Sequence, residues 1–437
     1  MIEKYLVKKI TEPVDWKVTV PGSKSMTNRA LLMAVLSAGT VRVEGVLFSD
    51  DSRHFLACLV SLGFAVQIEE EKKCVTVTGC GGRIPSREAV IDVGSAGTAA
   101  RFLAAMLGFS DGCYEIQMKR RPMAELFELL SGAGAKITFL EEEGHLPVRI
   151  AGCRSARADE TAGETPRRLS LDITKSTQFL SALLLIAPMV PEGMKIHITS
   201  EKTDGSYIRI TRKMMQEFGV SVTFDGRDYE VPAEASYRKE TYTVEPDMSA
   251  ACYFYAAAAV TGGRALVRHV HMDNTQGDLR FLEVLERMGC NADDTPEGVR
   301  VTGPADGALR GITVNMNDFS DQALTLAAIA PFADAPVRIE GIGHIRGQEC
   351  DRIHAIQTNL TALGIRCQEE DMAVTIAPGS NHSGNVETYD DHRVAMAFSL
   401  VGLRTDGIVI ENPACCRKTF ENYFTVLSEL TGKKMEA

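Results

Sequence analysis

Cationic and small polar residues gather in one short segment near the start of the chain, PGSKSMTNRALL at residues 21–32. Lys24 and Ser25 fall in the first turn of a predicted apolar helix, and Arg29 follows them. A helix start has free N–H groups and the positive end of the helix dipole, so cations placed there need a counter-anion. A plain N-cap needs only Ser or Asn. The segment therefore predicts an anion site.

Other predicted helix starts carry polar or charged residues of the same kind. Their segments are GSAGTAARF (94–102), KRRPM (119–123), KSTQF (175–179), NDFSDQALTLAAIA (317–330), RGQECDRIHAI (346–356), TYDDHRVAMAFSL (388–400) and CCRKTFENYF (415–424). We expect Pro122 at the first position of its helix. Arginines suit bidentate binding of phosphate and carboxylate groups, and carboxylates beside them suit proton transfer on a bound anion. If the helices of one domain point the same way, these ends converge.

Composition limits the partners of such a site. The 437 residues include 47 Lys and Arg against 58 Asp and Glu, a net charge of −11, which disfavours nucleic acid and anionic membranes as partners. The eleven cysteines form no C-x-x-C pair, so we expect reduced thiols and no metal. No P-loop or G-x-G-x-x-G motif indicates a nucleotide. No signal peptide or membrane-spanning stretch is recognised, so we expect a cytoplasmic protein acting on polyanionic metabolites.

A repeat organises the elements that must position these residues. One-sided helical patterns end at Gly63, Gly134, Gly219, Gly289, Gly364 and Gly432, spaced by 68 to 85 residues. An alternating run and a hairpin follow most of these glycines, and a second, nearly apolar helix lies between successive copies. The sequence therefore predicts an α/β fold with six β-α-β-α-β-β repeats, three in each of two similar domains.

The motifs PGSKSMTNRALL, GSAGTAAR, RRP, TYDDHRVAMAFSL and RKTFENYF resemble those of the 5-enolpyruvylshikimate-3-phosphate (EPSP) synthase family, in the family's order, from about residue 20 to 424. The resemblance implies two inverse α/β domains with the active site in the interdomain cleft. It joins residues 1–20 to 245–437 as one domain carrying the acidic catalytic residues. Residues 21–244 then form an inserted domain carrying shikimate-phosphate-binding residues.

The resemblance also implies a reaction, the transfer of the enolpyruvyl group of phosphoenolpyruvate to the 5-hydroxyl of shikimate 3-phosphate, with release of phosphate and without a cofactor. The implied catalytic residues are Lys24, Asp321, Glu349 and His392. Those implied for phosphoenolpyruvate are Lys24, Gly97, Arg121, Gln178, Arg352, Arg393 and Lys418. Those implied for shikimate 3-phosphate are Lys24, Ser25, Arg29, Ser176, Thr177, Gln178, Tyr207, Asp321 and Gln348. The family further implies a monomer and a target of glyphosate.

One departure from the family concerns the shikimate-phosphate half of the site. Gln348 stands where the family usually has Lys, so one phosphate-binding cation is missing, and Arg346 is a candidate substitute. Two alternatives therefore stay open: an enolpyruvyl transferase with another acceptor, such as UDP-N-acetylglucosamine, and a non-catalytic anion-binding paralogue. The first relies on a loop Cys that is missing around Arg120, and intact Lys24 and Glu349 argue against the second.

Overall fold

The computed structural model describes residues 3–118, 122–153, 166–174, 176–305 and 307–432. The chain divides into two compact units. Unit 1 comprises Met1–Pro21 and Pro246–Ala437, and unit 2 comprises Gly22–Glu245. Each unit encloses a hydrophobic core of its own.

One stretch of unit 2 contains a complete copy of the repeat. It runs through β6 (Glu88–Asp92), α3 (Gly97–Gly108), β7 (Cys113–Gln117), α4 (Ala124–Gly132), β8 (Lys136–Phe139) and β9 (Val148–Ala151). The first two strands pair in parallel across the helix, and the hairpin β8–β9 adds to the second strand, in the sheet order β6-β7-β9-β8. The predicted β-α-β-α-β-β unit is confirmed here.

Unit 2 holds two further copies. One consists of β10 (Arg167–Leu171), α5 (Gln178–Ile186), β11 (Met194–Ile198), α6 (Ser206–Glu217), β12 (Thr223–Phe224) and β13 (Asp228–Val231). The other consists of α1 (Lys24–Leu36), β3 (Thr40–Glu44), α2 (Asp50–Ser61), β4 (Ala65–Glu69), β5 (Cys74–Thr78) and β14 (Thr241–Thr243). Its parallel first strand, β14, comes from the far end of the unit and pairs with β3, so it ties the two ends of unit 2 together.

Unit 1 repeats the pattern, with both chain ends taking part. The first copy consists of β2 (Asp15–Val18), α7 (Met248–Thr261), β15 (Arg264–Arg268), α8 (Phe281–Arg287), β16 (Asn291–Thr295) and β17 (Gly298–Thr302). The second copy consists of β18 (Thr313–Asn315), α9 (Ala323–Ile329), β19 (Val337–Glu340), α10 (Arg352–Ala362), β20 (Cys367–Glu369) and β21 (Ala373–Ile376). The last consists of β22 (Gly384–Val386), α11 (His392–Arg404), β23 (Ile408–Glu411) and α12 (Tyr423–Leu430), with β1 (Lys4–Leu6). This sheet differs from the prediction because the single strand β1 replaces the hairpin beside β23.

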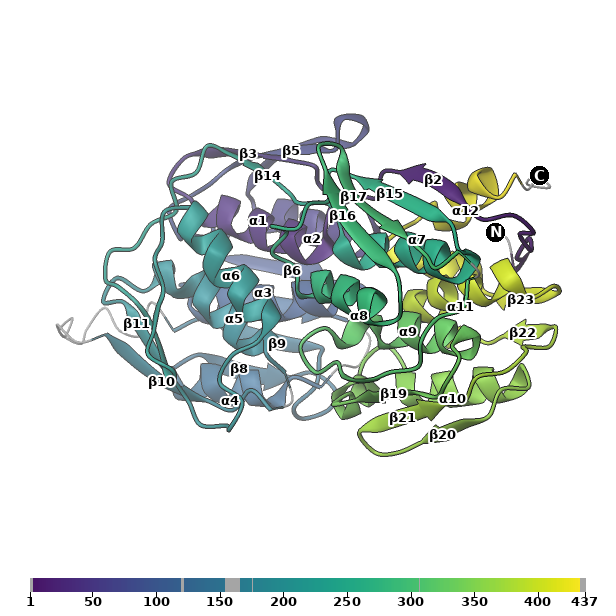
Figure 1. Cartoon of the computed structure of the whole chain (residues 1–437). Coiled ribbons are helices and arrows are strands. Elements are labelled where there is room, and N and C mark those ends of the chain that lie inside the picture. Colours follow the sequence, from purple (N-terminus) through teal and green to yellow (C-terminus); the bar gives the residue numbers. More distant parts are fainter. Residues whose placement is uncertain (1–2, 119–121, 154–165, 175, 306, 433–437) are drawn as a thin grey trace. The chain divides into compact units, whose positions relative to one another are not determined.

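The helices follow the two patterns read from the sequence. The apolar helices α1, α3, α5, α7, α9 and α11 are buried along most of their length. In unit 2, α1, α3 and α5 pack against one another, and Figure 1 shows β3, β5 and β14 along one side of these helices and β10 and β11 along another. Because the sheets cover them, nearly all-apolar sequences are favourable in these helices and polar residues are confined to their ends.

The repeated glycines end their helices with left-handed backbone. Gly134 follows α4 with φ 99° and Gly219 follows α6 with φ 93°. Such φ values strain every residue that carries a Cβ, and glycine avoids that strain. The spacing of the repeat in the sequence is therefore the spacing of these helix ends.

The prediction for Pro122 is wrong. The helix α4 begins at Ala124, and Pro122 instead forms an isolated antiparallel bridge with His145. The reason lies at Met123, whose backbone N–H donates to Gly144 O at 2.9 Å and whose φ of −146° is not helical. The chain is therefore held to the neighbouring hairpin turn for two residues before the helix starts.

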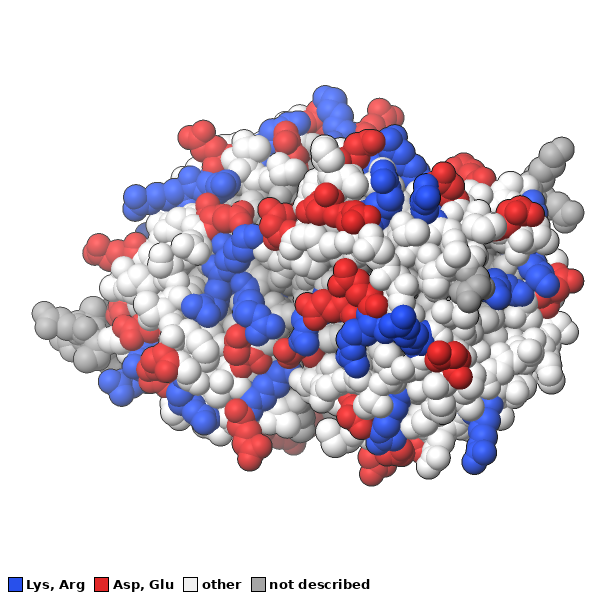
Figure 2. All heavy atoms as spheres, viewed as in Figure 1, with Lys and Arg blue, Asp and Glu red and all other residues white. Residues whose placement is uncertain are grey.

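Acidic and basic side chains are interspersed on the face shown in Figure 2. No broad basic area of the kind that binds nucleic acid lies on that face. Among the described residues, no helix is both long and apolar enough to span a membrane.

Candidate active site

In unit 1 a buried arginine gathers the charged residues predicted from the sequence. Arg352 is 1% exposed, and its guanidinium donates to Asp391 Oδ2 at 2.7 Å, Asp321 Oδ1 at 3.0 Å and Glu349 Oε2 at 3.1 Å. Two further cations complete the group, which we call the Arg352 cluster: Arg393 donates to Asp321 Oδ2 at 2.9 Å, and Lys418 donates to Glu349 Oε1 at 3.1 Å. Three cations and three carboxylates therefore share one network.

Most members of the cluster lie at or next to the start of a helix or in a short 3₁₀ helix. Arg352 is the first residue of α10, and Asp391 is the N-cap of α11, where it accepts from the backbone N–H of Arg393 at 2.8 Å. Asp321 lies in the short helix η5 (Ser320–Gln322), and Lys418 ends η8 (Pro413–Lys418). The helices α7, α9 and α11 pack together, as do α9 and α10, so these ends meet within unit 1.

The charges of the cluster stabilise one another. Burial alone would lower the pKa of Arg352, but the negative charges of Asp391, Glu349 and Asp321 outweigh it and raise the pKa above its ordinary value. Arg352 therefore stays charged, and removing any carboxylate would leave part of that buried charge uncompensated. An anionic ligand that binds Arg393 or Lys418 must compete with Asp321 or Glu349 for the same donors.

Gln348 takes part in the cluster as an acceptor. Its side-chain oxygen accepts from Arg352 Nη1. The candidate substitute cation, Arg346, is engaged elsewhere: its Nη1 lies 2.8 Å from carboxylate oxygens of both Asp351 and Glu369. His344, on η7 (Gly343–Gly347), forms a 2.8 Å hydrogen bond with Ser320 Oγ. Arg346 therefore forms ion pairs with Asp351 and Glu369 and is not part of the Arg352 cluster.

His392 lies beside the cluster and is 2% exposed. Its Nδ1 is 3.7 Å from Asp391 Oδ1, which is longer than a hydrogen bond. It follows Asp391 at the start of α11, a position that suits support of the Asp391–Arg352 pair.

In unit 2, Lys24 is paired with a carboxylate that sequence reasoning missed. Lys24 Nζ lies 3.3 Å from Asp51 Oδ2, and the side chain of Asp51 is 4% exposed. Asp51 sits in the first turn of α2 beside Asp50, where acids are common for helix-dipole reasons alone. Only its burial distinguishes it, and the sequence carries no signal for that.

Arg29 links four helices of unit 2. Its guanidinium donates to Thr211 Oγ1 at 2.8 Å and to the carbonyl of Ser25 at 2.9 Å, with longer contacts to Ser181 Oγ and Tyr207 O. It also lies over the rings of Phe102 and Tyr207, at 5.3 and 5.8 Å from the centroids. Burial lowers the pKa of Arg29 to about 10, so the group is still charged at neutral pH. The turns of α1, α3, α5 and α6 that it contacts therefore lie close together.

A second pair joins the predicted residues of α3 and α5. Arg101 Nη1 donates to Gln178 Oε1 at 2.5 Å and to Gly97 O at 3.3 Å, and its guanidinium lies 5.4 Å from the ring centroid of Phe179. The backbone N–H of Gln178 donates to Ser176 Oγ at 3.2 Å, and Thr177 is the N-cap of α5. Gly97, Ser176, Thr177 and Gln178 thus lie together, oriented by Arg101, which sequence reasoning left out of the site. Arg121 lies outside the described residues.

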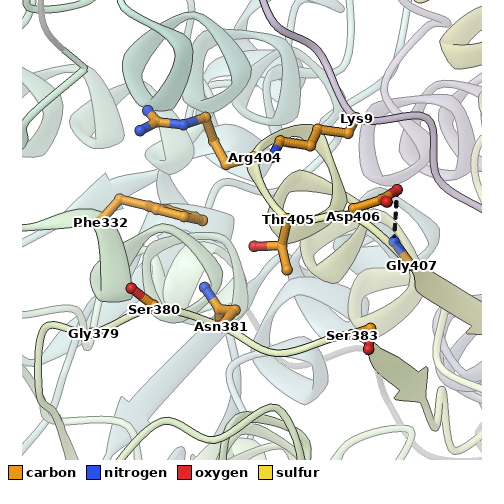
Figure 3. Close-up of a pocket in the computed structure, with 10 residues that line it drawn as sticks. All are labelled: Lys9, Phe332, Gly379, Ser380, Asn381, Ser383, Arg404, Thr405, Asp406 and Gly407. Atoms are coloured by element: carbon orange, nitrogen blue, oxygen red, sulfur yellow. Dashed lines mark hydrogen bonds between the residues drawn. The ribbon is translucent and has the colours of Figure 1, made fainter.

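The described residues hold no cluster of three or more His, Cys, Asp or Glu that could bind a metal ion. A cavity of about 540 Å³ does lie in unit 1, between Lys9, Phe332, Asn381 and the end of α11 at Arg404 (Figure 3). The guanidinium of Arg404 already has partners there: it donates to the carbonyl of Val260 and lies 5.5 Å from the Phe332 ring centroid. The cavity contains none of the predicted site residues.

Comparison with known proteins identifies the family. The sequence profile of EPSP synthase (3-phosphoshikimate 1-carboxyvinyltransferase) matches residues 8–427. The chain belongs to the EPSP synthase family. Curated 3-phosphoshikimate 1-carboxyvinyltransferases agree: that of Trichormus variabilis is 41% identical over 97% of this chain and 98% of its own length, and that of Sulfurovum sp. is 39% identical over 96% and 97%. The predicted family is thereby confirmed, and the chain is an enzyme of this transferase family.

Two solved structures share the fold. EPSP synthase from Acinetobacter baumannii superposes with a TM-score of 0.80 at 24% identity, covering 99% of both chains. The enolpyruvyl transferase NikO from Streptomyces tendae gives a TM-score of 0.72 at 16% identity, covering 98% of this chain and 97% of its own. The two-domain α/β fold class predicted from the sequence is confirmed, and the alternative acceptor UDP-N-acetylglucosamine is not favoured.

Proposed function

We propose that this chain transfers the enolpyruvyl group of phosphoenolpyruvate to the 5-hydroxyl of shikimate 3-phosphate and releases phosphate. The observation that carries the proposal is the Arg352 cluster, in a chain whose relatives bear the name of this reaction. Phosphoenolpyruvate has a phosphate and a carboxylate, and three cations held within hydrogen-bond reach of carboxylates match both its charge and its need for proton transfer.

Arg352, Arg393 and Lys418 of unit 1 are proposed to bind phosphoenolpyruvate. Their partners are set by the cluster, so Arg393 and Lys418 can exchange Asp321 and Glu349 for ligand oxygens while Arg352 keeps Asp391. The residues proposed to complete this half are Lys24, Gly97, Arg121 and Gln178.

Shikimate 3-phosphate is proposed to contact the helix starts of unit 2. Ser25 and Lys24 offer a hydroxyl and a cation at the start of α1, and Ser176 and Thr177 offer hydroxyls at the start of α5. Free N–H groups at these starts favour phosphate. The remaining residues proposed for this ligand are Arg29, Gln178, Tyr207, Asp321 and Gln348. Since Arg29 is buried and engaged with four helices, its proposed part is to hold Ser25 and Tyr207 in place.

The reaction needs proton transfers in both of its steps. In the first, the 5-hydroxyl oxygen bonds to C2 of phosphoenolpyruvate, the hydroxyl loses its proton to a base, and C3 gains a proton from an acid. In the second, C3 loses a proton and the C2–O bond to phosphate breaks, which restores the double bond and releases phosphate. Lys24, Asp321 and Glu349 are the proposed proton carriers, and His392 supports the site beside Asp391. Binding of phosphoenolpyruvate to Lys418 would free Glu349 for this task.

We further infer a monomer that works in the cytoplasm without a cofactor and is inhibited by glyphosate in competition with phosphoenolpyruvate. Size-exclusion chromatography with light scattering should give a mass of 47.6 kDa, that of the monomer. A mass near twice that value would contradict this part of the proposal.

Phosphate release tests the reaction directly. The purified chain is incubated with phosphoenolpyruvate and shikimate 3-phosphate, with phosphoenolpyruvate and UDP-N-acetylglucosamine, and with phosphoenolpyruvate alone. We expect phosphate only with shikimate 3-phosphate. Release only with UDP-N-acetylglucosamine would reassign the acceptor and keep the phosphoenolpyruvate site, and release with neither acceptor would favour a non-catalytic anion-binding protein.

A further inference from the structure

A further carboxylate, which is buried, lies next to the Arg352 cluster, at Asp278 in the short helix η4 (Gly277–Arg280). It is 7% exposed, and its Oδ2 accepts hydrogen bonds from Ser249 Oγ in the first turn of α7 and from Gln322 Nε2 at 2.9 Å. None of the roles proposed above uses this residue. A carboxylate is costly to bury, so its two donors and its position call for an explanation.

The donor Gln322 is the neighbour of Asp321. Gln322 is fully buried, and its side chain is held at both ends: Nε2 donates to Asp278, and Oε1 accepts from Thr325 Oγ1 at 2.9 Å. The segment η5 has only three residues, and 3₁₀ turns of this length have few hydrogen bonds of their own. The orientation of Asp321 toward Arg352 and Arg393 therefore depends on the anchorage of Gln322.

The loop that carries Asp278 is itself fixed to the start of α7. Gln276 Oε1 accepts from the backbone N–H of Met248 at 3.2 Å, and Gln276 Nε2 donates to the carbonyl of Pro246 at 2.7 Å. Asp278 is thus an acceptor fixed to the start of α7. It holds η5, the segment that carries Asp321 of the Arg352 cluster. Preorganised support of this kind is what keeps reacting groups in place.

We propose that Asp278 is a positioning residue for the enolpyruvyl transfer, which holds Asp321 toward Arg352 and Arg393 through the side chain of Gln322. The inference rests on the proposed function, since it concerns Asp321 of that site. It adds a residue that is remote in sequence from every motif used to recognise the family here.

Charged groups reach Asp278 from three packed elements. Asp321 faces it from η5 and Arg393 from α11, while α7 contributes the thiol of Cys252, whose pKa burial raises well above its ordinary value. Burial, followed by the charge of Asp321, raises the pKa of Asp278 to about 6, against the effects of Arg393, Ser249 and Gln322. As the pH falls through about 6, Asp278 gains a proton and loses acceptor capacity. The hold on Gln322 then weakens, so activity should fall on this acid limb.

The substitution Asp278→Asn tests the proposal, because it keeps the size of the side chain, removes the negative charge and leaves one neutral, weaker acceptor oxygen for Ser249 and Gln322. We expect kcat to fall about 10- to 100-fold, as is typical when a group that orients a reacting residue is changed. The KM for phosphoenolpyruvate should change less than about threefold, since Arg352 and Lys418 keep their other partners. The acid limb near pH 6 should be absent from the pH profile of the variant.

Exchange of the two partners provides a rescue. In the double variant Asp278→Asn with Gln322→Glu, the amide at 278 can donate to the carboxylate at 322, which restores the hydrogen bond with its direction reversed. We expect kcat at least about fivefold above that of the single Asp278→Asn variant. The matched control is Asp294→Asn, which changes a carboxylate of the same unit that accepts from the Met272 N–H at 2.9 Å. It should leave kcat unchanged.

Crystal structures of the wild type and of Asp278→Asn give a readout that does not depend on activity. The proposal predicts that the 2.9 Å contact between Arg393 and Asp321 is lost in the variant. An unmoved Asp321, or a variant with wild-type kcat and acid limb, would overturn the inference. If the wild type releases no phosphate, the proposed function fails. The two crystal structures alone then decide whether Asp278 positions Asp321. If Asp278→Asn does not fold, Gln322→Met removes the same hydrogen bond and must show the same losses.

Discussion

At Arg352 a single side chain brings three carboxylates together. Asp391, Asp321 and Glu349 come from positions up to 70 residues apart, and each accepts from the same guanidinium. Because the arginine is buried, its charge cannot be satisfied by water, and every partner is needed. This arrangement holds Arg393 and Lys418 close together and keeps Asp321 and Glu349 beside them.

Lys24 and Glu349 are expected to be essential for turnover. Lys24→Ala or Glu349→Ala should lower kcat by at least about 100-fold, because each removes a proposed proton carrier. Steady-state phosphate release measures this, and circular dichroism verifies folding. Lys72→Ala, on an exposed lysine of unit 2, is the control and should leave kcat unchanged. Wild-type turnover in either variant would remove that residue from the proposed mechanism.

At the scale of elements, the site depends on helix starts that converge within each unit. In unit 2 this convergence has a visible cause, because Arg29 on α1 contacts Phe102 of α3, Ser181 of α5 and Thr211 of α6. The same guanidinium therefore contacts three other helices and holds them close to α1. In unit 1 the Arg352 cluster has the equivalent effect on α10, α11 and η5.

Removal of Arg29 should loosen the helices of unit 2. Arg29→Met removes the buried guanidinium that donates to Thr211 Oγ1, Ser181 Oγ and Tyr207 O, so we expect the free energy of unfolding of this unit to fall by about 3 kcal/mol. Urea titration followed by circular dichroism measures the change. The control Arg209→Met breaks an exposed ion pair between α6 and Asp204, which precedes that helix, and should cost less than about 1 kcal/mol. Equal effects of the two variants would contradict the role given to Arg29.

Two neighbouring glycines separate helix propensity from backbone strain. Gly132 is the last residue of α4 and a Cβ there would meet no atom within 4 Å, whereas Gly134 has φ +99°. Gly132→Ala should therefore raise the free energy of unfolding by about 0.5 kcal/mol, and Gly134→Ala should lower it by about 1 to 2 kcal/mol. Urea midpoints of both variants test this. Stabilisation by Gly134→Ala would show that this helix end does not require left-handed backbone.

At the scale of the whole molecule, the chain leaves unit 1 after Pro21 and returns to it at Pro246. Inside unit 2 the two ends lie together, since the Ser23 N–H donates to Glu245 O at 2.9 Å and β14 pairs with β3. Inside unit 1 the Asp247 N–H likewise donates to Pro21 O at 2.8 Å. Unit 2 is therefore a continuous segment with adjacent ends and its own core.

Residues 22–245 should fold as an isolated fragment. We expect cooperative urea unfolding and the helical circular dichroism of unit 2, without phosphate release, because the Arg352 cluster is absent. The comparison fragment 22–238 lacks β14, which leaves the edge of β3 unpaired, and should be clearly less stable. A fragment 22–245 that stays unfolded would show that unit 2 needs the rest of the chain.

Much of this protein followed from the sequence itself. The six glycine-ended helices and the apolar helices between them determined the repeat, because local backbone strain and burial act on short windows of residues. The charged helix starts could also be predicted, because the polar residues near Lys24, Asp321 and Asp391 lie in short windows of the sequence. The family motifs lie in these windows, so the family could be predicted and was confirmed.

The partners of those residues were decided only by the tertiary structure. Nothing near Asp51 or Asp278 in the sequence marks them as buried, since burial depends on which distant segments cover them. The pairing of Arg352 with Asp391 and Asp321, the engagement of Arg346 by Glu369, and the replacement of a hairpin by β1 have the same origin. Local patterns determine which residues stand at helix ends, whereas the packing of those helices determines which ends meet.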